Sequence, residues 1–314
     1  MESGSRSART LLPSVLGLVL VGANVSAQAW LPPKGEAAFS LGWSRNWADH
    51  HIDYTGADVS PGDMIWHNAV TDLGYGVTDR LAVRVNIPFV TSKYVGTRPH
   101  PARPGRPPLD DGSWHSTFQD FRAEVRFKAT TGSLAVTPVV ALVVPSHGYE
   151  SHGHSGFGRK TVEGQFGINV GRLLDPLLPN AYLQARYVYA VPEEYVGLRP
   201  TRSSVVFDLG YFVTGSLTVS ALGAWTKTHS GWRGTVDFPR LPDQDFYHHD
   251  QLAKNEYFRL GGGANYALTG SIDIGVNYYT TLWARSDINM SGLALSVTYG
   301  FSPAQVVRRS KGAQ

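Results

Sequence analysis

Apolar and polar residues alternate with a period of two along much of this chain. In residues 119–129, Phe121, Val125 and Phe127 fall on one face, and charged residues occupy the other. The same pattern recurs in residues 81–89, 163–170, 183–189, 204–213 and 272–278. Because successive side chains of a β-strand point to opposite faces, each segment is predicted to be a two-sided strand. The chain is therefore predicted to be all-β.

The ends of the apolar faces indicate which kind of β-structure this is. They finish in aromatic residues such as Phe89, Tyr189 and Trp225, as expected for the aromatic girdles of a membrane barrel. Hydrophobic residues make up 42% of the chain, yet the mean hydropathy is only -0.17, because alternation disperses them. We predict a transmembrane β-barrel, with a secreted β-sandwich as the alternative.

Short glycine-containing links alternate with long polar segments between the predicted strands. The short links are residues 131–133, 214–216 and 269–271, with 76–80 as a related turn, and glycine is expected to supply positive φ there. The long segments are residues 47–62, 91–116, 145–161, 192–202, 227–255 and 283–290. This asymmetry predicts an antiparallel barrel of about twelve strands, with short periplasmic turns and long extracellular loops. Pro138 does not fit this prediction, because it lies within a predicted strand and has no backbone N–H to donate, and a closed barrel has no edge strand where that donor would not be needed.

The first residues have the features of an export signal. Arg6 and Arg9 precede an apolar stretch, residues 11–23, and the small residues Ala27 and Ala29 follow it. We predict a cleaved signal peptide at residues 1–29, a barrel at 30–301 and a basic C-terminal tail at 302–314; the alternative is an uncleaved anchor. The first strand follows so soon that no N-terminal plug is expected. Export and a barrel together predict the outer membrane of a Gram-negative bacterium.

Several motifs resemble those of a known family. Tyr75-Gly76-Val77-Thr78-Asp79-Arg80 is similar to an aromatic-Gly-x-Thr-Asp-Arg turn, and the strand after it ends in Pro88-Phe89. Residues 119–128 and 144–148 resemble later motifs, with substitutions. The family comprises outer-membrane β-barrel transporters named for the meta-pathway of phenol degradation. The resemblance implies passage of small molecules, aromatic ones among them. The last strand, residues 291–301, also resembles the signal read by the barrel assembly machinery.

Catalytic motifs are absent from the sequence. Phe157 replaces the last glycine of a G-x-S-x-G pattern, and there is no P-loop, no H-E-x-x-H and no cysteine. We therefore expect no enzyme, no catalytic residue and no cofactor. A lipase-type barrel, whose serine and histidine would be distant in the chain, is the less favoured enzymatic alternative.

Most of the 11 histidines fall in the predicted long loops. His147, His152 and His154 share one loop, and others share two more: His50, His51, His248 and His249. Imidazoles at the outer mouth could bind zinc or copper, or they are simply polar loop residues. The spacing fits no closed zinc motif, so no metal ligand is assigned.

The polar faces of the predicted strands are expected to line the lumen. The candidates for a constriction are eight charged residues of both signs: Arg84, Asp120, Arg122, Glu124, Arg126, Glu163, Arg186 and Asp208. The favoured function is a channel for passive passage of small solutes, with aromatic or hydrophobic ones as candidates. The alternative is a structural or surface-interaction barrel whose charges pair across a closed lumen. Expected partners are the solute, outer-membrane lipid, lipopolysaccharide and the assembly machinery, and no basic face suggests nucleic acid.

Overall fold

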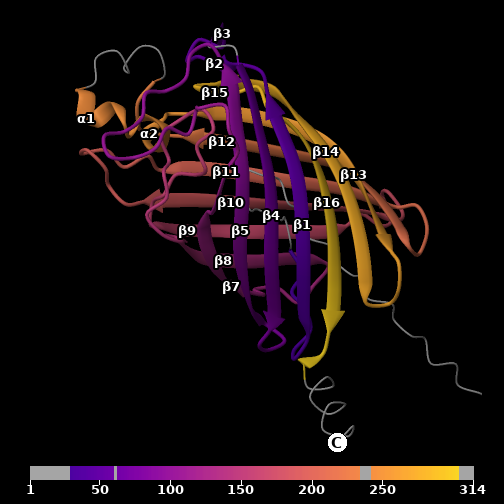
Figure 1. Ribbon diagram of the computed structural model, residues 1–314. Helices are drawn as coiled ribbons and strands as arrows, with labels where there is room; N and C mark the ends of the chain where they lie inside the picture. Colours follow the sequence, from indigo (N-terminus) through magenta and orange to yellow (C-terminus); the bar gives the residue numbers. More distant parts are fainter. Residues whose placement is uncertain (1–28, 60–61, 234–241, 304–314) are drawn as a thin grey trace, which may run out of the picture.

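The alternating segments form the wall of a closed antiparallel barrel in the computed structural model, which describes residues 29–59, 62–233 and 242–303 (Figure 1). The wall strands are β1 (Ala37–Ala48), β4 (Gly62–Gly76), β5 (Leu81–Gly96), β6 (His115–Phe118), β7 (Asp120–Phe127), β8 (Leu134–Pro145), β9 (Glu163–Leu173), β10 (Ala181–Pro192), β11 (Arg202–Phe212), β12 (Leu217–Thr228), β13 (Glu256–Ala267), β14 (Ile272–Arg285) and β16 (Ser291–Phe301). Strands β6 and β7 both pair with β5 and count as one interrupted strand, which gives twelve. Pairing of β4 with both β1 and β5 closes the barrel, as predicted.

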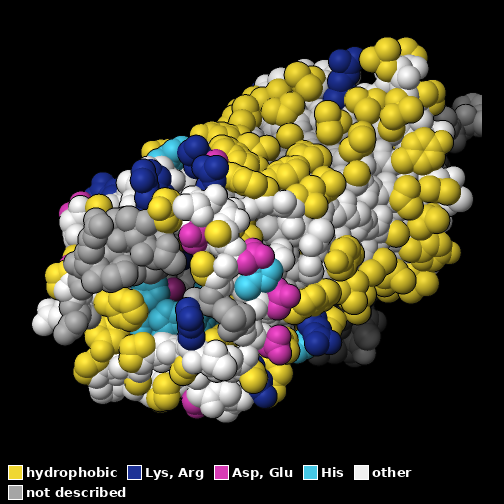
Figure 2. All heavy atoms as spheres, turned by 90° about the horizontal axis from the view of Figure 1, so that it is seen from above, with side chains coloured by type: hydrophobic (Ala, Val, Ile, Leu, Met, Phe, Trp, Pro, Cys, Tyr) yellow, Lys and Arg dark blue, Asp and Glu magenta, His cyan; other side chains and the backbone are white. Residues whose placement is uncertain are grey.

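The two faces of the wall differ in the sense that the alternation predicts. On β7, Val125 and Phe127 are each 47% exposed, whereas Glu124 and Arg126 are 2% exposed. Apolar side chains cover the outer wall (Figure 2), and polar side chains fill the interior. An apolar outer surface is suited to the hydrocarbon core of a lipid bilayer. The single closed sheet excludes the alternative of a secreted β-sandwich, which would have two sheets. No helix among the described residues is long and apolar enough to cross a membrane.

Threonine hydroxyls hold three of the short turns. Thr214 Oγ1 accepts hydrogen bonds from the backbone N–H groups of Ser216 (3.1 Å) and Leu217 (2.9 Å). The threonines at positions 78 and 269 accept the equivalent bonds. The expectation that glycine supplies positive φ here is wrong, because Gly132, Gly215 and Gly270 all lie outside the left-handed region. The side-chain hydrogen bond replaces the turn that a left-handed glycine would make.

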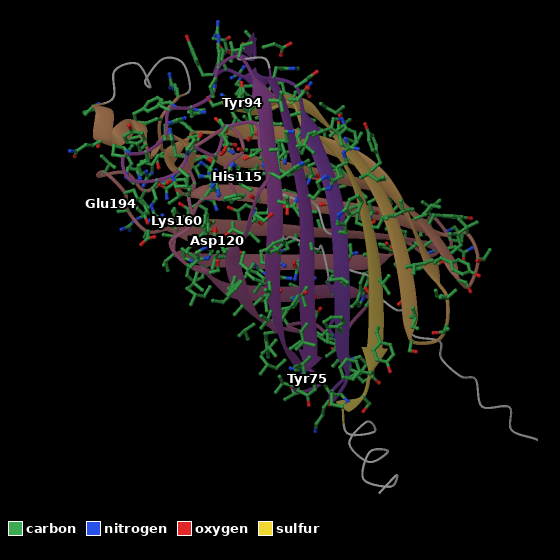
Figure 3. The ribbon with its side chains drawn as sticks, viewed as in Figure 1. Tyr75, Tyr94, His115, Asp120, Lys160 and Glu194 are labelled. Atoms are coloured by element: carbon green, nitrogen blue, oxygen red, sulfur yellow. The ribbon has the colours of Figure 1, made fainter. Side chains whose placement is uncertain are left out.

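The long segments gather at the end of the barrel opposite the short turns and the C-terminal end of β16 (Figure 1). Two of them form a small three-stranded sheet from β2 (His51–Ile52), β3 (Asp58–Val59) and β15 (Asp287–Ile288). Residues 243–252 form two single-turn helices, α1 (Asp243–Phe246) and α2 (His249–Leu252). Tyr94, buried near the loop end of β5, and Tyr75, at the turn end of β4, mark the two ends of the wall (Figure 3).

Pro138 faces outward in β8 and pairs with Ile168 of β9, but the β7–β8 ladder ends at the pair Arg126–Val139, next to the proline. The proline therefore lies beyond the last pair of that ladder, where a missing donor is tolerated. Most of the predicted signal peptide and of the basic tail lie outside the described residues.

Candidate functional site in the barrel interior

Glu124 is the centre of an ion-pair cluster inside the barrel. Arg122 and Arg126 lie two positions before and after it on β7, so all three side chains share the inner face. Both guanidinium groups pair with the Glu124 carboxylate. Arg186 Nη2 lies 2.5 Å from Glu124 Oε2, and neither side chain is exposed. Since β10 is three strands away from β7 in the wall, this contact spans the interior.

Arg84 extends the cluster onto β5. It is the cross-strand partner of Glu124 in the β5–β7 ladder, and its Nε lies 2.6 Å from Asp72 Oδ2 on β4. Asp72 is not among the predicted residues, because its strand lacks a run of charged residues on the polar face. Four guanidinium groups thus face two carboxylates, and this level of the interior carries net positive charge.

The other three predicted residues lie inside the barrel and do not pair with Glu124, although Gln165 joins Glu163 to Arg122 by hydrogen bonds to both. Glu163 pairs with Arg202 of β11. Asp208 accepts hydrogen bonds from Tyr182 and Gln184, each at 3.0 Å. Asp120 lies at the loop end beside Lys160 (Figure 3). The Tyr149 hydroxyl donates to Asp120 Oδ1 at 2.5 Å and accepts from the Lys160 backbone N–H at 2.8 Å.

The segment just before β1 runs along the inner wall. The Ala29 carbonyl accepts a hydrogen bond from Thr137 Oγ1 (2.7 Å), and its N–H donates to Gln184 Oε1 (3.3 Å). Trp30 packs edge-on against Tyr182. Gly171 makes room for the segment, because a Cβ there would lie 2.5 Å from that of Ala29. No local pattern in the sequence signals these contacts.

The loop end assembles a second group of titratable side chains. His51, His100, His152, His154 and His249 come together from four loops, with two aspartates among them. Burial would raise the pKa of Asp110, but hydrogen bonds from His100, His154 and Ser155 hold it well below its usual range. Burial, with the neighbouring histidines, lowers the pKa of His51 to about 3. The group therefore contains an ionised carboxylate beside a neutral imidazole at ordinary pH.

Comparison with known proteins agrees with the architecture. No protein-family model matches the sequence, and no curated protein matches it. Among solved structures, an outer membrane channel from Pseudomonas putida F1 superimposes with a TM-score of 0.66 and 13% identity, over 87% of this chain and 98% of that one. The NanC porin gives a TM-score of 0.50 and 8% identity, over 83% of this chain and 98% of that one. The protein thus has the fold of outer-membrane β-barrels, and the family resemblance around Tyr75 rests on its motifs alone.

Proposed function

We propose that this protein is a non-enzymatic outer-membrane channel that passes small solutes, and that it favours those carrying negative charge. The observation behind the proposal is the cluster around Glu124, in which guanidinium groups outnumber carboxylates. Arg186 Nε and Nη1 are buried and have no hydrogen-bond partner among the described residues. They are therefore donors that a passing anion or water could use.

The same arginines make aromatic solutes suitable candidates. A guanidinium plane stacks on aromatic rings and forms bidentate bonds with carboxylates, so it suits an aromatic acid better than a purely aliphatic molecule. The side chains that point inward, and not the backbone, would limit the size of the solutes that pass, because the interior of a barrel of this strand number is narrow enough for side chains to fill much of it. The Arg186–Glu124 pair and the segment at Trp30 both narrow the path.

Planar-bilayer recording tests this function. Purified wild-type protein should give single-channel steps, and a salt gradient should give a reversal potential showing anion preference. Arg186→Gln should shift that potential toward cations, because it removes one positive charge from the cluster. Arg199→Gln is the matched control, since Arg199 is 52% exposed in a loop. Absence of conductance together with unchanged liposome swelling would contradict a channel.

A closed structural or surface-interaction barrel is the second candidate. It is favoured by the complete burial of the Glu124 and Arg186 side chains, because a filled level would block passage. In that case, replacing residues 103–107, which include Arg103 and Arg106, with a Gly-Ser linker should weaken lipopolysaccharide binding while solute flux stays at the background level.

Partnership with the assembly machinery is likewise proposed, from the outward residues of β16 that end in Tyr299.

A further inference from the structure

Four loops bring seven possible metal ligands together at the loop end of the barrel. Histidine side chains are visible among these loops when the molecule is seen from above (Figure 2). The group consists of His51, His100, Asp110, His152, His154, His249 and Asp250. His100 and His249 are 149 positions apart in the sequence, so only the closed barrel brings them together.

The pair His100–His249 is unusual because both rings present the same nitrogen to each other. Their Nε2 atoms are 3.0 Å apart. His100 Nδ1 lies 3.0 Å from Asp110 Oδ2, and His249 Nδ1 lies 2.6 Å from the carbonyl oxygen of Phe246. Both partners can only accept, so each neutral ring holds its proton on Nδ1. When both rings are neutral, two Nε2 lone pairs face each other, which is unfavourable unless a proton or a metal ion lies between them.

The neighbouring pair His51–His154 has no such conflict. His154 Nε2 donates to the carbonyl oxygen of Arg98 at 2.9 Å. Its Nδ1 is then free to accept the proton of His51 Nε2, 2.6 Å away. This pair is satisfied by an ordinary hydrogen bond and needs no ion.

Asp110 is suited to support a ligand rather than to be one. Its two oxygens accept hydrogen bonds from the backbone N–H groups of His100, His154 and Ser155, in addition to the His100 ring. A carboxylate that orients a histidine through Nδ1 is the usual outer partner of a metal-binding imidazole. Asp250 instead points Oδ1 at His249 Nε2, 3.2 Å away.

We propose that His100, His249 and Asp250 bind a divalent transition-metal ion of the zinc class, with His152 as the fourth ligand. Ligand atoms of the first three lie within 4.8 Å of one another. In a tetrahedral site with zinc–nitrogen bonds of about 2.0–2.1 Å, two nitrogens lie roughly 3.3 Å apart, close to the 3.0 Å between the two Nε2 atoms. Nitrogen and carboxylate ligands favour zinc or copper over magnesium or calcium.

His152 completes the set. Its side chain is 2% exposed, and neither ring nitrogen has a hydrogen-bond partner among the described residues. Its ring centre lies 4.9 Å from that of His100 and 5.1 Å from that of His249. Its Nδ1 is 3.6 Å from Asp250 Oδ2. A buried imidazole without a partner is costly, and a metal bond removes the cost.

The bound metal would cross-link three loops that no disulfide joins, because the chain has no cysteine. His100 belongs to the β5–β6 loop, His152 to the β8–β9 loop, and α2 supplies the other two ligands. The site does not depend on transport through the lumen, so failure of one proposal leaves the other standing.

Metal titration of the whole protein tests the site. Protein without a histidine tag, purified in detergent and stripped with chelator, is titrated with Co²⁺ and then with Zn²⁺. We expect one saturable Co²⁺ site per chain, with the visible absorption of a tetrahedral complex that Zn²⁺ abolishes. His249→Gln and Asp250→Asn should each weaken Zn²⁺ binding by at least tenfold. Asp110→Asn, which changes the residue that orients His100 and not a metal ligand, should weaken it by ~10–100-fold.

His248→Gln is the matched control. His248 is the sequence neighbour of His249, but its Nδ1 is 2.7 Å from Gln251 Oε1 and it is no member of the group. Its variant should bind Zn²⁺ as the wild type does. If the wild type gives no saturable Co²⁺ absorption, the proposal is wrong. Equal weakening by His248→Gln would also overturn it. Heat-modifiable migration on gels checks folding, and the wild-type titration decides alone if a variant fails to fold.

Discussion

The barrel wall and the loop end are organised in different ways. In the wall, the environment of a residue follows from the alternation of side chains between the two faces of a strand: Val125 faces outward because its neighbour Glu124 faces inward. At the loop end, the environment follows from contacts between distant segments, as for His154 beside His51, 103 positions away. A period in the sequence therefore identifies a face, but it does not identify which residues meet across space.

The inner face of the wall depends both on the alternation along each strand and on contacts between distant strands. Parity places Glu124 and Arg186 on the inside. Only the closure of the barrel brings them to 2.5 Å. Breaking an ion pair on the inner face should therefore cost more free energy of unfolding than a substitution on the outer face.

Breaking the central ion-pair cluster should have the largest effect. Glu124→Gln leaves three arginines facing a neutral amide in a buried site. Removing one partner of a buried ion pair costs about 3–5 kcal/mol. Urea unfolding of the refolded protein in detergent, followed by tryptophan fluorescence, measures the loss. Glu124→Asp, which keeps the charge, should lose less, and an unaffected Glu124→Gln would show that water screens the interior.

A charge on the outer wall should have the next largest effect. Val125→Arg places a guanidinium on the lipid-facing side of β7, where Val125 is 47% exposed. Near the bilayer midplane this costs ~2–4 kcal/mol. The expected result is a lower unfolding midpoint in lipid vesicles and a loss of heat-resistant migration on gels. Val125→Leu should behave as the wild type. If Val125→Arg folds normally, the assignment of the two faces is reversed.

At the loop end, Asp110→Asn should act locally and more weakly. The amide loses the charge that Asp110 offers to His100 and to the backbone of His154 and Ser155. One or two such bonds are worth ~1–3 kcal/mol. In metal-free protein, hydrogen exchange at the amides of His154 and Ser155 should quicken, while the unfolding midpoint of the barrel stays unchanged. A shifted midpoint would mean that wall and loops unfold as one unit.

Much of the wall could be predicted from the sequence. The alternating segments at residues 163–170, 183–189 and 272–278 lie within β9, β10 and β14, because alternation is a local property of the sequence. The inner position of the eight charged residues followed from the same parity. Their partners did not: Asp72, Arg202 and Tyr149 belong to strands or loops whose sequence gives no sign of the contact.

The features that the sequence did not reveal depend on contacts between distant segments or on atomic detail. Ala29 enters the barrel through bonds to Thr137 and Gln184, and these can be recognised only once β8 and β10 face a common interior. Gly215 was expected in the left-handed region, but the hydroxyl of Thr214 holds that turn instead. The histidine group was left unassigned because its spacing follows no linear motif, although closure of the barrel brings its members together.

The smallest effect is expected for an ion pair on the exposed part of a loop. Glu194 and Arg199 lie 3.7 Å apart and are 55% and 52% exposed. Exposed pairs contribute roughly 0–1 kcal/mol, because water and salt screen them and two long side chains lose freedom. Glu194→Gln should therefore shift the urea midpoint by much less than Glu124→Gln, although both substitutions remove one negative charge beside arginine. Measuring both variants at low and high salt separates burial from charge. Equal losses would show that the interior is as well screened as the loops, and the contrast between the two regions would fail.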